Sequence, residues 1–262
     1  MHHPMSRSLE PPPTVQVMIT GGTIVYCEPG TWPSAGELVG CGSRYTSTNF
    51  YHKLGCLLHD PRVTAFGEVG LDFEGASSRE RGLQVSTLRW SFQHVKEEIP
   101  LVLHLRGTRI DPLSEEVGAE CRHILRDVGV SRSQKIHLHC FTGGNKEYRR
   151  WTRDYSNVYF GFTRMVQNFN KEQVGVLRNL RETEFLLETD SPYFPPRGTE
   201  IGHPQYIGEI TQLVVESRGR GLKETIERAT RNWVVPCPVK DPVVYVNKEL
   251  RNSYVNTLTC SV

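Results

Sequence analysis

Four short apolar runs in this chain each end on a side chain that can bind a metal ion. Burying an unpaired carboxylate costs several kcal/mol or more, so Asp190 at the tip of one run needs a partner, and we expect a cation. Carboxylate oxygens and imidazole nitrogens together suit Zn²⁺, Mn²⁺ or Mg²⁺ and require no sulfur ligand. The runs and the residues that end them are 63–67 with Glu68, 100–103 with His104, 136–138 with His139, and 184–189 with Asp190.

The spacing of these four residues indicates how they meet. Successive members lie about one or two strand–helix units apart, at roughly 30 residues per unit. In a parallel barrel the strand ends converge on one rim, where residues distant in sequence share a site. We therefore expect two carboxylates and two imidazoles to form one cluster.

Apolar residues at helical spacing separate the strand-like runs, and this alternation predicts the fold class. Strands that alternate with helices imply an α/β fold with a mostly parallel sheet and right-handed crossovers. A further strand is expected at 157–162, and Gly219 is expected to cap a helix at its C-terminus. Helices are expected around 85–95, 117–128, 174–177, 207–214 and 222–233.

The chain is predicted to consist of a leader, one barrel domain and a tail. Residues 1–14 are polar and rich in proline, which predicts a disordered leader. The barrel domain is expected at 15–235, and 236–262, interrupted by prolines, is a tail of uncertain order. Shorter pieces expected inside the domain are strands at 15–19, 22–26 and 37–41 and a helix at 49–59.

Composition excludes several classes of protein. At 262 residues and a net charge of +2, the chain can form one large barrel and has no global basic field for non-specific nucleic-acid binding. Seven cysteines without a C-x-x-C pair argue against a disulfide framework and a thiolate zinc site. No apolar stretch reaches membrane-spanning or signal-peptide length, so we expect no membrane partner and a cytoplasmic or nuclear location.

Three ordered motifs stand out: Gly67-Glu68-Val69-Gly70-Leu71-Asp72-Phe73, His139-Cys140-Phe141-Thr142-Gly143 and Glu188-Thr189-Asp190-Ser191-Pro192-Tyr193. Together they resemble the signatures of the TatD family of metal-dependent deoxyribonucleases. Residues 101–106 resemble the family's strand ending in His-Cys-Arg, with Leu105 in place of the cysteine. The resemblance is closest to the animal TatD-domain-containing branch, through 25–31 and 160–163, and covers roughly residues 15–233.

The resemblance implies a distorted (β/α)8 barrel of the metal-dependent hydrolase kind that cleaves phosphodiester bonds in DNA, either single-stranded DNA or duplex ends. One or two divalent ions, Mg²⁺, Mn²⁺ or Zn²⁺, are implied. Glu68 would bridge two metals, His104 and His139 would hold one of them, and Asp190 would bind the other or accept a proton from the attacking water.

The sequence also departs from the family pattern. The family commonly opens with an Asp-x-His-x-His strand, and no segment before residue 15 resembles it. A Gly-x-His-Pro-His segment should fall near residues 40–44, where no histidine stands. We therefore expect one intact metal site, one depleted site, and a barrel that lacks its first strand.

Other polar residues have competing interpretations. Arg106 and Arg197 are candidates for binding a substrate phosphate, or salt-bridge residues. His137 lies two positions before His139, on the same face of a strand, and is a second ligand or, preferably, a packed core histidine. Asp72 is expected to order its loop. Residues 149–153 mix basic and aromatic side chains and are expected to form a solvated helix face rather than a DNA contact.

Three functions follow from these observations. The ligand set favours a metal-dependent DNase. The missing opening histidines favour a catalytically degenerate or truncated relative with reduced metal binding. Because a fold and its ligands do not fix the substrate, another metallohydrolase of the lactonase or amidohydrolase type is the third.

Overall fold

A five-stranded parallel sheet forms the centre of the protein. The computed structural model describes residues 13–15, 17–19, 65–234 and 254–256. The strands lie in the order β2-β3-β4-β5-β6, so each pairs with its neighbour in sequence. Their bounds are β2 Phe66–Asp72, β3 Leu101–Arg106, β4 Lys135–His139, β5 Asn157–Phe162 and β6 Phe185–Leu187.

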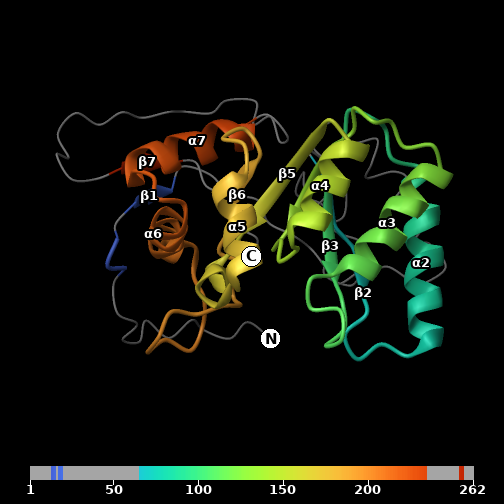
Figure 1. The fold of residues 1–262 in the computed structure, drawn as a ribbon, viewed down its shortest axis with the longest axis horizontal. Helices are drawn as coiled ribbons and strands as arrows, with labels where there is room; N and C mark the ends of the chain where they lie inside the picture. Colours follow the sequence, from blue (N-terminus) through green and yellow to red (C-terminus); the bar gives the residue numbers. More distant parts are fainter. Residues whose placement is uncertain (1–12, 16, 20–64, 235–253, 257–262) are drawn as a thin grey trace, which may run out of the picture.

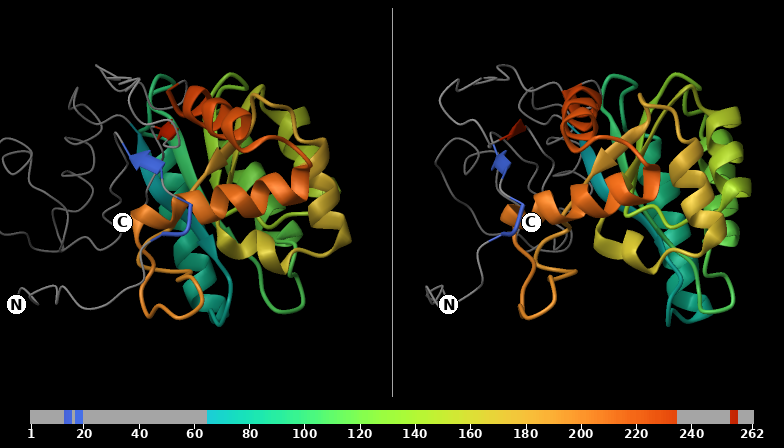
Figure 2. Two further views of the ribbon diagram at one scale, coloured as in Figure 1. Left: turned by 90° about the vertical axis from the view of Figure 1, so that its left-hand side faces the viewer. Right: turned by 60° about the vertical axis from the view of Figure 1, so that its left-hand side comes forward.

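Helices connect the strands and pack against one another in sequence order. In Figure 1 the helices α2, α3 and α4 lie on one side of the sheet region, and α6 and α7 lie at the other end of the molecule. Each helix from α2 to α7 contacts the next, which gives the curved belt seen in Figure 2. The helices are α2 Ser78–Phe92, α3 Glu115–Asp127, α4 Asn145–Asp154, α5 Lys171–Asn179, α6 Ile207–Arg218 and α7 Leu222–Val234, with short 3₁₀ turns at Arg164–Asn168 and Pro204–Tyr206.

Local sequence signals explain where the helices begin and end. Capping boxes begin α2 and α5, formed by Ser77 with Glu80 and by Asn170 with Gln173. In each box, the side chain of one residue accepts a hydrogen bond from the backbone N–H of the other. The carboxylate of Asp111 accepts from two backbone N–H groups in the first turn of α3. Gly219 ends α6 with φ 67, as expected for a glycine C-cap.

Side-chain alternation divides each strand between two environments. In β4, Ile136 and Leu138 belong to the apolar core between sheet and helices. Successive side chains of a strand point to opposite faces, so His137 and His139 share the other face. On β5 and β6, Tyr159 and Leu186 form a small second cluster of buried residues. The polar residues of the strands therefore project away from the helical belt.

A second, two-stranded sheet lies apart from the first. Strand β1, Val17–Ile19, pairs in parallel with β7, Tyr254–Asn256. Nearby, the backbone N–H of Thr14 donates to Glu209 Oε1 on α6 at 2.6 Å. Residues 254–256, within the stretch expected to be a tail, thus form a strand.

The strand boundaries correct two expectations. Glu68 does not follow its strand but is the third residue of β2, which continues to Asp72 because it stays paired with β3 as far as Arg106. Gly70 allows this close pairing, since a Cβ there would lie 1.8 Å from the carbonyl oxygen of His104. Conversely, β6 ends at Leu187, so Asp190 lies on the loop after it.

Other expectations are met, corrected in part, or fall outside the described residues. The strand at 157–162 is β5 as predicted. Residues 149–153 lie on α4, but Trp151 is buried in the core, so the segment is not wholly the solvated face that was expected. Helix α2 ends at Phe92, so Val95 packs from the following turn and not from the helix. The expected leader before residue 13, the strands at 22–26 and 37–41 and the helix at 49–59 lie outside the described residues.

A buried ion pair joins α3 to α4. Arg122 donates to both carboxylate oxygens of Glu147, at 2.5 and 3.1 Å, and both residues are almost fully buried. The guanidinium also lies 5.1 Å from the ring centroid of Trp151. Charges that have lost their water in this way must be paired.

Replacement of Arg122 by methionine is predicted to lower the free energy of unfolding by about 3 kcal/mol, because the buried Glu147 carboxylate loses its two-point partner. Arg126→Met is the matched control on the same helix, since Arg126 is exposed and its ion pair among the described residues is with Asp154 at 3.5 Å. That control should change stability by less than about 1 kcal/mol. Equal losses in the two variants, measured by urea unfolding, would contradict this account.

Candidate metal centre

Three of the predicted residues meet at the carboxyl edge of the sheet. Strand register places His104 opposite His139 and next to Gly70 of β2. His104 Nδ1 lies 2.6 Å from Glu68 Oε1, and His139 Nε2 lies 3.3 Å from the same oxygen. One ligand atom from each of the three residues falls within 4.8 Å of the others, a spacing that can enclose one metal ion.

Asp190 joins this group from the loop after β6. Its Oδ1 lies 3.3 Å from His139 Nε2, and its Oδ2 accepts from the Cys140 thiol at 3.4 Å. Asp190 has φ 50, a left-handed conformation that Asp tolerates better than most residues. His139, Cys140 and Asp190 form a second group with metal-ligand spacing, so His139 is common to both groups.

A fully buried carboxylate, Glu188, lies behind the histidines. Its Oε1 is 3.1 Å from His139 Nδ1 and 2.5 Å from His137 Nε2, and its Oε2 accepts from the backbone N–H of Cys140 at 2.9 Å. Gly161 on β5 leaves room for it, since a Cβ there would lie 2.3 Å from the carboxylate. With Nδ1 directed to Glu188, His139 presents Nε2 to Glu68 and Asp190. A carboxylate behind a histidine in this way is typical of metal sites.

The electrostatics of the group are strongly coupled. Burial alone would raise the pKa of Glu68, but the hydrogen bond from His104 and the charges of the histidines hold it below its usual value. Burial would lower the pKa of His139, and the charge of Glu188, with the bond to Asp190, raises it well above 6.5 instead. The pKa of Glu188 is lowered despite its burial, because His139 and His137 surround it. Without a metal, the carboxylates around His139 therefore favour its protonated form.

The donor set fits a divalent cation. Two carboxylate oxygens face the single nitrogen His139 Nε2 at 3.3 Å each, and His104 supplies a second imidazole. Oxygen and nitrogen donors of this kind suit zinc and manganese, and carboxylates also suit magnesium. A cation held here would replace the proton on His139 as the partner of the carboxylates.

The group opens into a hollow of about 900 Å³. Arg106 lines this hollow but pairs with Asp72 at 3.0 Å, so both of its predicted roles, phosphate contact and salt bridge, are compatible with its position. Arg197 is exposed and, among the described residues, is not part of the lining of this hollow. The structure therefore brings Arg106 to the site and leaves Arg197 outside it.

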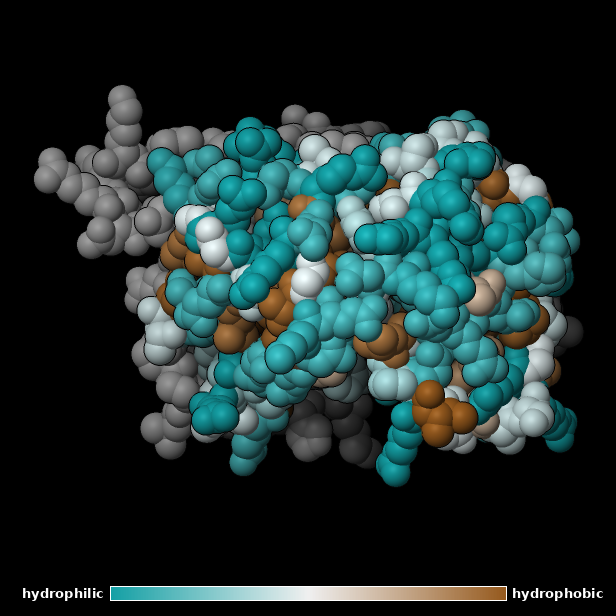
Figure 3. Space-filling view, in the orientation of Figure 1, coloured by the Kyte–Doolittle hydropathy of each residue, from teal (hydrophilic) through white to brown (hydrophobic). Residues whose placement is uncertain are grey.

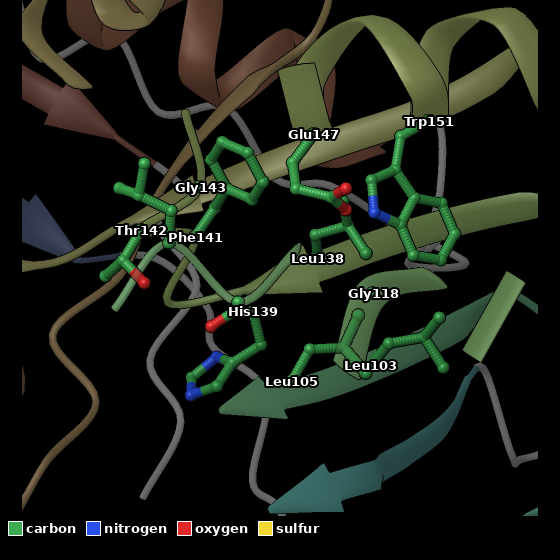
Figure 4. A pocket seen from close by; sticks show the side chains of 12 residues that line it. Leu103, Leu105, Gly118, Leu138, His139, Phe141, Thr142, Gly143, Glu147 and Trp151 are labelled. Carbon is green, nitrogen blue, oxygen red and sulfur yellow. The ribbon is translucent and has the colours of Figure 1, made fainter. Parts of the chain in front are cut away.

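The rear of His139 is packed against protein. Figure 4 shows His139 at the end of β4, pointing away from Glu147 and Trp151 on α4. The small cavity between them, about 20 Å³, is lined mostly by apolar side chains. His137, whose core position was the preferred interpretation, is buried and contacts Glu188.

Glu188 and Cys140 are residues to which the sequence argument gave no role. Both lie inside the quoted motifs, Cys140 directly after His139 and Glu188 two positions before Asp190. The available signal was the two-residue period, because Glu188 lies two positions before Asp190 as His137 lies two before His139. Cys140, with φ 47, has a backbone conformation uncommon outside glycine and held by Glu188, and such positions cluster at functional sites.

Fold and site together define an α/β-barrel type of protein, with acids and histidines gathered at the carboxyl ends of parallel strands. Residues 15–234 match the sequence profile of the family described as TatD related DNase. The chain therefore belongs to the TatD family, which is metal-dependent.

Named relatives agree with this assignment. The chain is 30% identical over 205 residues to the 3'-5' RNA nuclease TATDN2 of Homo sapiens, covering 72% of this chain and 25% of that protein. It is 26% identical over 175 residues to the putative deoxyribonuclease TATDN3 of Mus musculus, covering 65% and 54%. The chain thus spans a quarter and about half of the length of these two relatives.

A bacterial relative and a solved structure match over more of their length. The 3'-5' ssDNA/RNA exonuclease TatD of Enterobacter lignolyticus is 25% identical over 196 residues, covering 72% of this chain and 70% of that protein. The crystal structure of YJJV, a TatD homolog from Escherichia coli K12, superposes with a TM-score of 0.60 at 21% identity, covering 74% and 72%. This likeness shows the barrel-type fold.

Replacement of Glu188 by glutamine is predicted to weaken metal binding about 10- to 100-fold, because the neutral amide no longer fixes His139 and supports its basicity. Glu184→Gln is the matched control, since Glu184 is also buried and lies just before β6 while Glu188 lies just after it. Titration calorimetry with Mn²⁺ measures both. Equal affinities in E188Q and E184Q would contradict the positioning role.

Metal affinity is predicted to fall as the pH falls, because a proton on His139 competes with the ion. The pKa of His139 in the metal-free protein is raised above 6.5, so the loss of metal affinity begins above pH 6.5. Once the pH is below the raised pKa of His139, the affinity falls by nearly tenfold per pH unit. Glu68, whose pKa is lowered, adds to the loss only in more acidic solution. An affinity that stays constant between about pH 8 and about pH 6 would exclude this competition.

Proposed function

We propose that this chain is a metal-dependent nuclease that hydrolyses phosphodiester bonds in single-stranded DNA or at duplex ends. The proposal rests on one observation: two acids and two histidines lie together at the carboxyl edge of the sheet, beside a hollow large enough for a nucleotide. These residues are Glu68, His104, His139 and Asp190. The relatives named as nucleases of DNA and RNA support the same class of substrate.

The protein side chains would act in distinct ways. Glu68, His104, His139 and Asp190 would hold a divalent cation, which would supply the Lewis acidity that stabilises charge on phosphoryl oxygens and makes water more acidic. Glu188 keeps His139 in one tautomer through Nδ1.

Two further side chains would handle the proton and the substrate. Asp190 accepts the proton of the attacking water at a carboxylate oxygen. Arg106, more than half exposed, binds a phosphate oxygen beside its partner Asp72. Arg197, outside the hollow, would contact only nucleic acid that extends beyond it.

Asp190→Asn is predicted to lower the rate of nucleotide release by at least about 100-fold, because the amide cannot accept the proton. The assay uses end-labelled single-stranded DNA and RNA with Mg²⁺ or Mn²⁺. Asp127→Asn, which alters an exposed surface pair with Arg89, is the control and should keep full activity. Comparable rates for the wild type and D190N would assign the cleavage to another group or a contaminant.

The metal requirement is tested separately from turnover. His139→Ala should retain little metal after purification, because the residue belongs to both groups of ligands. Metal analysis of the wild type and this variant measures it. If both retain the same metal, the site as described is wrong, whereas full metal without cleavage would favour a degenerate relative.

A further inference from the structure

Tyr193 is an exposed aromatic side chain at the mouth of the hollow. The face of the protein in Figure 3 is mainly hydrophilic, with hydrophobic side chains scattered over it. Among the described residues, the exposed large hydrophobic side chains are Leu83, Ile110, Tyr193 and Ile201. Of these four, Tyr193, with 65% of its surface exposed, is the one that lines the hollow.

The backbone under Tyr193 is fixed relative to the proposed metal centre. Its N–H donates to the carbonyl of Asp190 at 2.8 Å, and the N–H of Gly202 donates to the carbonyl of Pro192 at 2.8 Å. Gly202 packs so closely that a Cβ there would lie 2.1 Å from the carbonyl oxygen of Tyr193. The ring thus projects from a braced turn three residues after Asp190.

Other aromatic residues line the same hollow. Phe169, at the end of the 3₁₀ turn, is half-buried against Phe162 with ring centroids 6.2 Å apart. Phe194 follows Tyr193 with φ 51, a conformation that bulky residues rarely adopt. The hollow therefore has an apolar, aromatic part in addition to its acidic part.

Both arginines in the lining of the hollow, as far as the structure describes it, are paired with acids. Arg106 pairs with Asp72 at 3.0 Å, and Arg109 pairs with Glu74 at 3.4 Å. The remaining acids of the lining are Glu68, Asp111 and Asp190. Because both guanidinium groups are paired with acids, contacts with the uncharged bases would add to the affinity for a nucleic acid.

We propose that Tyr193 is a stacking platform for a nucleobase next to the bond that is cleaved, and that it selects unpaired nucleotides. This inference rests on the proposed nuclease function and adds a specificity residue to it. An aromatic ring stacks on any base whose face is free, and in a continuous duplex the neighbouring base pairs cover those faces. Unpaired and terminal nucleotides therefore fit this position.

The test measures binding rather than cleavage. Fluorescence anisotropy with Mn²⁺ gives the Kd of labelled single-stranded oligonucleotides whose phosphorothioate linkages slow hydrolysis. A matched series carries one abasic residue at each position near the 3' end. In the wild type, one abasic position should raise Kd about 5- to 150-fold, the value of one base–aromatic stack.

Variants assign this effect to the ring. Tyr193→Ala should raise the Kd of the intact oligonucleotide by the same factor and should lose the response to that abasic position, whereas Tyr193→Phe should keep both. Ile201→Ala, an exposed apolar residue outside the lining, is the control and should match the wild type. Mn²⁺ affinity should be equal in all four proteins.

The outcomes separate this inference from the nuclease proposal. Cleavage by the wild type, with Y193A binding as tightly and responding to the abasic series in the same way, would overturn the stacking role alone. Binding through Tyr193 without cleavage would remove the nuclease proposal and leave the stacking role. No oligonucleotide binding by the metal-loaded wild type would refute both.

Discussion

The buried carboxylate of Glu188 is the contact on which the site depends. It has no exposure to solvent and holds two imidazoles and the backbone N–H of Cys140, so it ties the end of β6 to the end of β4. An ionised group this deep is tolerated only with several partners. The same contacts set the direction of His139, which is shared by both groups of possible ligands. Gly161 has no side chain and so leaves the space that the Glu188 carboxylate occupies.

Around that contact, the strands bring site residues together at one edge of the sheet, and the loop after β6 adds further site residues. Parallel pairing in sequence order brings residues from β2, β3 and β4 to one edge, although long stretches of chain separate them. The helical belt packs the other face, so the rear of His139 is closed and Nε2 is presented on the side of the carboxylates. Asp190 and Tyr193 come from the one loop after β6, which places a possible proton acceptor beside an aromatic surface.

Much of this arrangement could be predicted from the sequence because apolar periodicity reports burial directly. Strand β5 and the alternation of strands with helices follow from it, as does the clustering of His104 with His139. Periodicity does not report pairing partners, so it ended the strand before Glu68, whereas contact with β3 carries β2 on to Asp72. The two-residue period marks Glu188, two positions before Asp190, but it does not show that this carboxylate is fully buried against two histidines, because that depends on how the strands pair. The ion pair of Arg106 with Asp72 depends on two adjacent strands in the same way.

We propose that four side chains, two acids and two imidazoles, surround one divalent cation. A crystal of the protein grown with Mn²⁺, measured near the manganese absorption edge, tests it most directly through the anomalous difference map. We expect a peak within bonding distance of His139 Nε2 and the carboxylates of Glu68 and Asp190. A strong peak elsewhere, or no peak between these residues at saturating Mn²⁺, would contradict it.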